Sequence, residues 1–298
     1  MDPAIILFGL GVGLLVGITG MGGGSLMTPL LILVIGTKPV VAVGTDLAYG
    51  AVTKTLGGWR HFRKGTVFPR LAFWLAVGSC PAALLGVWVL DQVHDAVGDD
   101  FDTFMLVAIG GVLLLTGGLV LLRALAIADH SARERGAFRM QTRHKVAAVA
   151  LGASVGFVLG ITSAGSGTLI GIGLILGFRL SPHRVVGTDV AHAAVLLWVA
   201  AFAHVIAGNV DFGLAGTILI GSLPGVWIGT NIATKLPRNA LRAALGVVLL
   251  TSGLALLSKA GLELPAFVLV LVPVVGTAGC YLILRRRTPE ARLVENAR

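Results

Sequence analysis

The sequence predicts an all-α polytopic membrane protein with two inverted-topology repeats, each a re-entrant or broken helical hairpin plus three transmembrane helices, and one extra C-terminal helix. Of the 298 residues, 56% are hydrophobic and only 12% are charged. Several apolar runs reach the roughly 20 residues that span a bilayer core. The net charge of +9 is spread over short loops between these runs. That distribution is typical of membrane topology and argues against a nucleic-acid-binding face.

A glycine-rich segment, GITGMGGGS at residues 17–25, interrupts the first apolar run. Glycine is a poor helix former, and an unpaired backbone N–H or C=O group in hydrocarbon is very costly. Such a break persists in a membrane only where protein, water or a ligand satisfies the backbone. The segment is therefore a candidate binding site.

The same segment occurs twice, because the chain matches itself at a shift of 143 residues. The GIT sequence at 17–19 aligns with 160–162, and the VGTD sequence at 43–46 aligns with 186–189. Near the ends of the halves the shift falls to 135, so the second copy lacks eight residues around 91–102. The chain is thus an internal duplication.

The expected helical spans follow the apolar runs in chain order. They are 5–19 and 25–36, 40–62, 67–90, 103–126, 146–162 and 168–178, 183–206, 212–233, 240–257, and 265–284. The expected units are a first transmembrane repeat at 1–127, a cytoplasmic linker at 128–145, a second repeat at 146–260, and an extra helix with a basic tail at 261–298.

Each hairpin arm is short for a full crossing, and length alone permits either one broken crossing or a re-entrant turn. The distribution of Lys and Arg residues distinguishes a broken crossing from a re-entrant turn. With re-entrant hairpins, all Lys and Arg residues except Lys38, Lys54 and Lys259 lie on one side, as the positive-inside rule favours. Each half then has three crossings, so the halves are inverted, the N-terminus is outside and the C-terminus is cytoplasmic. Secondary transporters often have this plan.

The second arm of each hairpin is expected to begin near the bilayer centre, where its free N–H groups and positive dipole end favour an anion. Glycines there let a ligand approach the backbone, and hydroxyl groups add donors. The predicted substrate-binding residues are Thr19, Gly22, Gly23, Gly24, Ser25, Thr45, Thr162, Ser163, Gly165, Ser166, Gly167, Thr168 and Thr188. Alternatively, the small tip residues only permit tight helix crossing, the role expected for the GxxxG spacings at 9–17 and 152–160.

Ionisable residues inside apolar runs are costly and by default functional. Those predicted to couple ions or to form an ion pair are Asp46, Lys54, Asp189 and His192. The two acids could instead cap helix starts, and Lys54 could pair statically with either of them. His192 replaces Tyr49 of the first half and could carry a proton near neutral pH, or be a satisfied core histidine.

The motifs GITGMGGGSLMTPLL and VGTDLAYGAVTKTLGGWRHFRKGTV, with their echoes in the second half, resemble the TauE/SafE sulfite exporter family, also called the toluenesulfonate uptake permeases. The resemblance covers almost the whole chain. It implies a bacterial cytoplasmic-membrane transporter for small sulfur-containing or carboxylate anions such as sulfite or sulfoacetate. The family often carries Ser where this chain has Asp46 and Asp189. Two acids near an anion site repel the anion unless they are protonated or paired with Lys54.

The remaining expectations concern partners and other functions. Protons are the candidate coupling ion, an oligomer is left open, and no metal or cofactor is expected, since Cys80 and Cys280 lack the spacing of a zinc or redox site. A passive anion channel could use the same helix ends. An intramembrane hydrolase would need Ser166 to form a dyad with His192 or with His204, which is otherwise expected at the membrane interface.

Overall fold

The computed structural model describes residues 2–19, 24–126, 140–233 and 238–263, together with 265, 267, 271, 274 and 276. Each regular element within this part of the chain is a helix, which confirms the predicted all-α class. The elements are α1 (Pro3–Thr19), α2 (Gly24–Leu30), the π-helix η1 (Leu31–Ile35), α3 (Pro39–Arg63), α4 (Pro69–Val97), the 3-10 turn η2 (Gly98–Asp100), α5 (Phe101–Ala126), α6 (Thr142–Thr162), α7 (Ser166–Leu176), α8 (Pro182–Ile206), α9 (Phe212–Ala233) and α10 (Arg238–Lys259).

These bounds follow the predicted spans closely, partly because proline marks several helix starts. Pro39, Pro69 and Pro182 each occupy the first turn of a helix, where the missing N–H costs nothing. The main difference is α4, which continues to Val97 instead of ending at residue 90. Its last turn is held by an edge-to-face contact between the rings of His94 and Phe101, 4.7 Å apart. The predicted span at 265–284 lies mostly outside the described residues.

Within the described residues, five helical segments are long and apolar enough to cross a membrane, which confirms a polytopic membrane protein. The first of them runs through α4, η2 and α5, and the others are the long helices α6, α8, α9 and α10. The helices α1 and α7 are apolar but shorter, as expected for hairpin arms. Charged residues within α3, among them Asp46 and Lys54, lower its hydropathy and separate it from the five.

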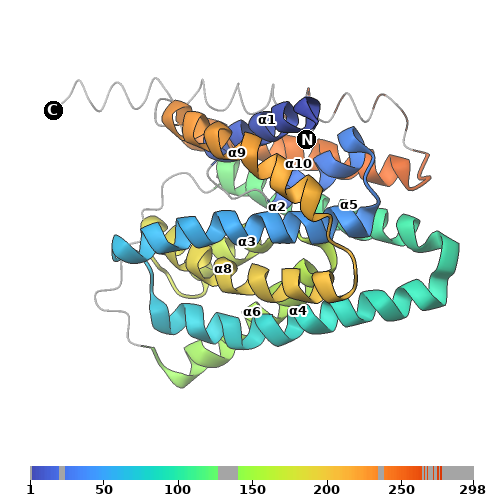
Figure 1. Ribbon diagram of the computed structural model, residues 1–298. Coiled ribbons are helices and arrows are strands. Elements are labelled where there is room, and N and C mark those ends of the chain that lie inside the picture. The colour runs from blue at the N-terminus through green and yellow to red at the C-terminus, as the bar shows by residue number, and fades with distance from the viewer. Residues whose placement is uncertain are drawn as a thin grey trace.

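The helices pack mainly across the two halves of the chain. α3 and α8 lie side by side in the middle, between the α1–α9 pair and the α4–α6 pair (Figure 1). The fourth extensive pairing joins α5 to α10. Each of these four pairings joins a helix of the first half to one of the second, so the two halves share one interleaved core.

Glycines make the closest helix crossings, as predicted for the GxxxG spacings. A Cβ atom on Gly13 would lie 2.2 Å from the carbonyl oxygen of Ser222, and one on Gly156 would lie 2.2 Å from that of Ser79. These two contacts correspond to each other under the 143-residue shift. The sequence duplication is therefore matched by reciprocal contacts in space.

Candidate functional site

The break between α6 and α7 is a tight turn of buried residues. α6 ends at Thr162, and Ser163 and Gly165 take left-handed backbone conformations, with φ of 57° and 90°. A left-handed conformation is uncommon for a residue with a side chain. It reverses the chain within three residues, so that α7 begins at Ser166.

The two hairpins meet at this turn. The backbone N–H of Gly165, in the second hairpin, donates to Oγ of Ser25 in the first turn of α2, with an N···O distance of 3.2 Å. The structure therefore brings together two predicted binding residues that are 140 positions apart. Gly22, Gly23 and the side chain of Thr19 lie outside the described part of the chain.

Asp46 joins this meeting point from α3. Its Oδ2 atom accepts hydrogen bonds from Oγ1 of Thr28 at 2.6 Å and from Oγ of Ser163 at 2.8 Å. The side chain is fully buried, and its Oδ1 atom has no hydrogen-bond partner among the described residues. One carboxylate thus ties the first hairpin to the second. We refer to Ser25, Thr28, Asp46, Ser163 and Gly165 as the tip site.

The other predicted residues of the second hairpin surround the tip site. Thr162 is buried, donates to the carbonyl of Val158, and accepts from the N–H of Ala164 at 3.3 Å. Ser166, Gly167 and Thr168 form the first turn of α7, and no side chain caps the N-terminus of that helix. First-turn N–H groups of this kind have no partner within their own helix, so they are available to an anion.

Thr45 and Thr188 lie elsewhere. The hydroxyl of Thr45 accepts the N–H of Asp211 at 3.1 Å, and that of Thr188 accepts the N–H of Phe68 at 3.0 Å. The two contacts are equivalent in the repeats, and they hold the starts of α9 and α4. The structure therefore gives the hydroxyls of these two predicted substrate-binding residues a contact with the backbone at a helix start.

A second polar cluster, the Asp189 cluster, is formed by Ser79, Asp189, His192 and Lys54. The hydroxyl of Ser79 and Nε2 of His192 are 2.8 Å apart, and Ser79, His192 and Asp189 are all buried. Oδ1 of Asp189 and Nδ1 of His192 have no hydrogen-bond partner within the described ranges. Half-buried Lys54, on α3, lies within electrostatic reach of both Asp189 and His192. Of the two predicted acid partners, Asp189, across the α3–α8 crossing, is the one with which Lys54 interacts electrostatically.

The two membrane acids are not equivalent. Thr28 and Ser163, which donate to Asp46, align with Gly171 and Gly20 in the other repeat. Asp189 therefore lacks the two hydroxyl donors that Asp46 has. Instead, its surroundings contain a cation and a histidine.

His204, in the last turn of α8, is fully buried. Its Nε2 atom is 2.9 Å from the carbonyl oxygen of Gly160, near the end of α6. A hydrogen bond there satisfies a carbonyl that the broken helix leaves without its usual N–H partner. His192 and His204 are thus engaged with Ser79 and Gly160, and neither is hydrogen-bonded to Ser166 in the described structure. The described residues therefore form no Ser-His dyad at Ser166.

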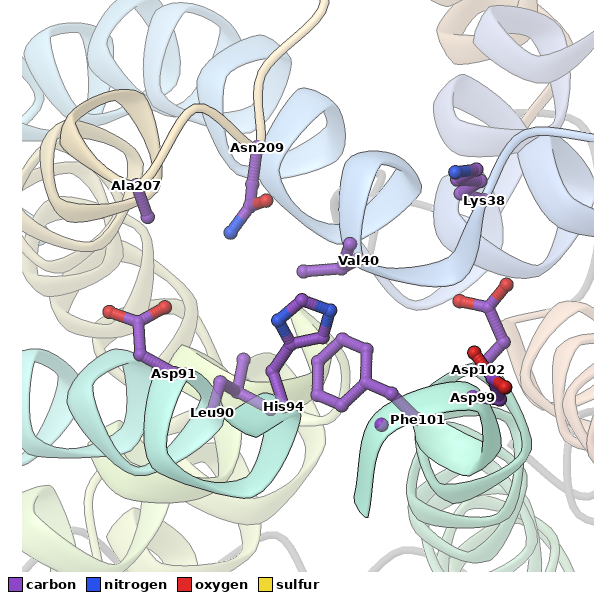
Figure 2. Close-up of a pocket in the computed structure, with 11 residues that line it drawn as sticks. Lys38, Val40, Leu90, Asp91, His94, Asp99, Phe101, Asp102, Ala207 and Asn209 are labelled. Carbon is purple, nitrogen blue, oxygen red and sulfur yellow. The ribbon is translucent and has the colours of Figure 1, made fainter. Parts of the chain in front are cut away.

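A cavity of about 380 Å³ lies where α4 passes into α5, and it is lined by Lys38, Val40, Leu90, Asp91, His94, Gly98, Asp99, Phe101, Asp102, Ala207 and Asn209. Figure 2 shows Asp91 and His94 on one wall, Lys38 and Val40 across from them, and Asp99 and Asp102 at one side. Val40 precedes Asp46 by six residues of α3, or about 9 Å at 1.5 Å per residue. The cavity, which is lined by three Asp side chains, therefore lies beside the start of α3.

Sequence reasoning missed Thr28 and Ser79. Thr28 follows Ser25 by three residues, so the two lie on one face of a short helix, and this spacing could have indicated it. Ser79 lies in an apolar run, and only the approach of α8 gives it a polar partner. Nothing in the local sequence signals that contact.

Comparisons with known proteins agree with this architecture. A family model described as sulfite exporter TauE/SafE matches residues 5–256. The probable membrane transporter protein YjnA of Bacillus subtilis (strain 168) is 38% identical over 258 residues, covering 86% of this chain and 100% of the relative. A probable membrane transporter protein of Xylella fastidiosa (strain 9a5c) is 28% identical over 255 residues, covering 84% and 93%. No solved structure matches at a significant level.

Proposed function

Since the chain belongs to the sulfite exporter TauE/SafE family and is a membrane transporter, we propose that it is a secondary transporter that exports small sulfur-containing anions. Sulfite and sulfoacetate-like sulfonates are the substrates that we expect. An interior-negative potential favours efflux of a monoanion by ~2.3 kcal/mol per 100 mV. Export therefore needs no further driving force, although a coupled proton can add one.

The observation that carries the proposal is the meeting of the two hairpins at the tip site. The Gly165–Ser25 hydrogen bond places the uncapped N-terminus of α7 beside the first turn of α2. N–H groups and hydroxyls that converge in a buried setting suit a sulfonate or sulfite oxygen. A change in the relative position of the hairpins would expose the bound anion to one side or the other.

The Asp189 cluster is the proposed coupling site. Its unpaired carboxylate oxygen and imidazole nitrogen can each accept a proton. Lys54 lies within electrostatic reach of both residues and is on α3, which also carries Asp46. Protonation at Asp189 would free Lys54 to neutralise the substrate, which links proton and anion through one helix.

We further propose an inner-membrane orientation with the N-terminus outside and the C-terminus in the cytoplasm. The reciprocal contacts of Gly13 and Gly156 support a two-fold relation between the halves, and the distribution of basic residues supports inversion. Exposed Lys64 lies just before the start of α4, and exposed Asp95 lies in the last turn of the same helix. In a chain without Cys80 and Cys280, Asp95→Cys should react with an impermeant thiol reagent in intact cells, and Lys64→Cys should not. Labelling of Lys64→Cys from outside would contradict this orientation.

Transport is tested in proteoliposomes with sulfite, sulfoacetate, other sulfonates and carboxylates under imposed pH and voltage gradients. The wild type should transport at least one of these anions, at a rate that depends on the pH gradient. Asp189→Asn should keep the transport but lose that dependence, because an amide cannot take up a proton. Asp95→Asn, a carboxylate change at an exposed position, is the matched control and should behave as the wild type.

Three outcomes would contradict these proposals. Failure of every anion in the panel would reject the substrate class. Full dependence on the pH gradient in Asp189→Asn would show that this carboxylate is structural. Single-channel currents in planar bilayers would favour the passive anion channel instead of a transporter.

A further inference from the structure

We propose that Asp46 and Tyr49, three residues apart on α3, form a pair of neutral O–H donors that binds oxygens of the transported anion. In this pair Asp46 is the protonated carboxylic acid. The inference rests on the proposed function and deepens it, because it states which side chains bind the anion. It extends the tip site by one residue, Tyr49.

Buried polar side-chain atoms without a hydrogen-bond partner follow the repeat. In the part of the chain that the structure describes, they include Oδ1 of Asp46 and the hydroxyl of Tyr49 on α3, Oδ1 of Asp189 and Nδ1 of His192 on α8, and Nδ1 of His204. The shift of 143 residues aligns Asp46 with Asp189 and Tyr49 with His192. An unpartnered buried donor or acceptor is costly. Its presence at the same two positions of both repeats therefore indicates that α3 and α8 each bind a ligand there.

Asp46 and Tyr49 lie on one buried face of α3. Residues three apart in a helix are neighbours on its surface. A long side chain in a helix also leans toward the preceding turn, which here carries Asp46. The exposed fractions of Asp46 and Tyr49 are 0% and 1%, and the two groups interact electrostatically. One anion can therefore reach both unpartnered oxygens.

The surroundings of Asp46 favour the neutral acid. Its Oδ2 atom accepts from the hydroxyls of Thr28 and Ser163, and no basic side chain of the described residues forms an ion pair with it. Lys54 lies eight residues further along α3, or about 12 Å at 1.5 Å per residue, and it interacts with Asp189. Burying an ionised carboxylate without a cation is very costly. A proton on Oδ1 removes that cost and makes this oxygen a donor.

The pair has the chemistry that an oxyanion needs. A phenol and a carboxylic acid each carry one O–H donor. A sulfonate, sulfite or carboxylate group offers two or more oxygens that share its negative charge, and such oxygens form strong hydrogen bonds. Ser163, which donates to Asp46, precedes Ser166, the first residue of α7, by three positions. The free N–H groups of α7 are therefore near the pair and can bind the same anion.

The second repeat shows why this pair binds the anion and its equivalent does not. A phenol keeps its proton at neutral pH, so Tyr49 is always available as a donor. An imidazole nitrogen is a donor or an acceptor according to its tautomer and charge. His192 also contacts Ser79 and lies within electrostatic reach of Lys54. The α3 pair is thus suited to holding an anion, and the α8 pair to moving a proton.

The first test is calorimetric titration of the full chain in phosphatidylcholine nanodiscs with sulfite and, separately, with sulfoacetate. Tyr49→Phe keeps the ring and removes only its oxygen, so it should weaken binding by roughly tenfold or more. Asp46→Asn keeps an N–H donor and should weaken binding less. Ser154→Ala removes an exposed hydroxyl that donates to the carbonyl of Ala150 in its own helix. It is the matched control and should leave the affinity unchanged.

The second test detects the proton on Asp46 without any ligand. Infrared difference spectroscopy at neutral pH compares the wild type with Asp46→Asn. The wild type should show the C=O stretching band of a protonated carboxylic acid, and the variant should lack that band. Asp95→Asn, a change at an exposed carboxylate, should retain it.

The outcomes separate this inference from the proposed function. Wild-type affinity in Tyr49→Phe would overturn the pair as an anion site and leave its unpartnered atoms to a buried water. Loss of no acid band in Asp46→Asn, or tighter binding of the anion by this variant, would show that Asp46 is ionised and repels the anion. Failure of the wild type to bind or transport any anion of the panel would reject the proposed function and the ligand of the pair together. The infrared band would still decide whether Asp46 is a donor.

Discussion

Replacing Asp46 with alanine is expected to lower the transport rate by about 100-fold or more, because the two hairpins lose the group that holds them in register. The carboxylate accepts from Thr28 in the first hairpin and Ser163 in the second. Without it, each hydroxyl is left buried and unpaired, at a cost of about 1–3 kcal/mol each. The initial transport rate in proteoliposomes and the free energy of unfolding in mixed micelles measure the two effects.

The control separates charge from hydrogen bonding. Asp46→Asn keeps an oxygen acceptor for both hydroxyls, so it should retain substrate binding and most of the stability. Asp95→Ala changes an exposed carboxylate and should leave both quantities as in the wild type. If Asp46→Ala transports at the wild-type rate, Asp46 does not hold the hairpins, and the tip site loses its central residue.

The largest effect on folding is expected for Gly156→Leu. A Cβ atom at this position would lie 2.2 Å from the carbonyl oxygen of Ser79, well inside contact distance, so α4 and α6 would have to separate. Overpacking in a well-packed core typically costs about 1–3 kcal/mol, and a clash with backbone exceeds that range. We expect a loss of more than ~3 kcal/mol in the free energy of unfolding, measured by titration with a denaturing detergent.

Gly111→Leu is the matched comparison. It also replaces a glycine within a helix, but a Cβ atom there meets no neighbour within 4 Å. Leucine favours helix over glycine by about 0.5–1 kcal/mol, so this variant should be as stable as the wild type or slightly more. Similar destabilisation of the two variants would show that the contact between α4 and α6 is not the cause.

The sequence predicted the helices well because in a membrane protein the apolar runs are also the secondary structure. The hairpin breaks, the Pro-marked helix starts and the doubled GxxxG pattern all depend on local composition, and the structure places them accordingly. The α4 extension to Val97 was missed because hydropathy ends at Asp91, although the helix itself continues. A helix can therefore continue beyond the last residue of the apolar run that predicted it.

The site could be predicted only in part. Backbone breaks indicated the tips, but which tip contacts which depends on how the two halves interleave. The Asp46–Ser163 hydrogen bond spans 117 positions, and the Ser79–His192 contact spans 113. The asymmetry between Asp46 and Asp189 becomes visible only when Thr28 and Ser163 are known to donate hydrogen bonds to Asp46. An alignment of the two repeats places Asp46 and Asp189 at equivalent positions and does not reveal this difference.

The interleaving of the halves also determines the order in which the protein can be made. Gly13 of α1 packs on Ser222 of α9, so the first helix to leave the ribosome has its partner synthesised roughly 200 residues later, or about 10–40 seconds at bacterial elongation rates. During that interval the glycine face of α1 is open to lipid or to other nascent segments. Completion of the core is therefore a late, post-insertional event. A ribosome that stalls before α9 leaves a fragment in which α1 and α5 lack the helices they pair with, whereas both members of the α3–α8 and α4–α6 pairings are present.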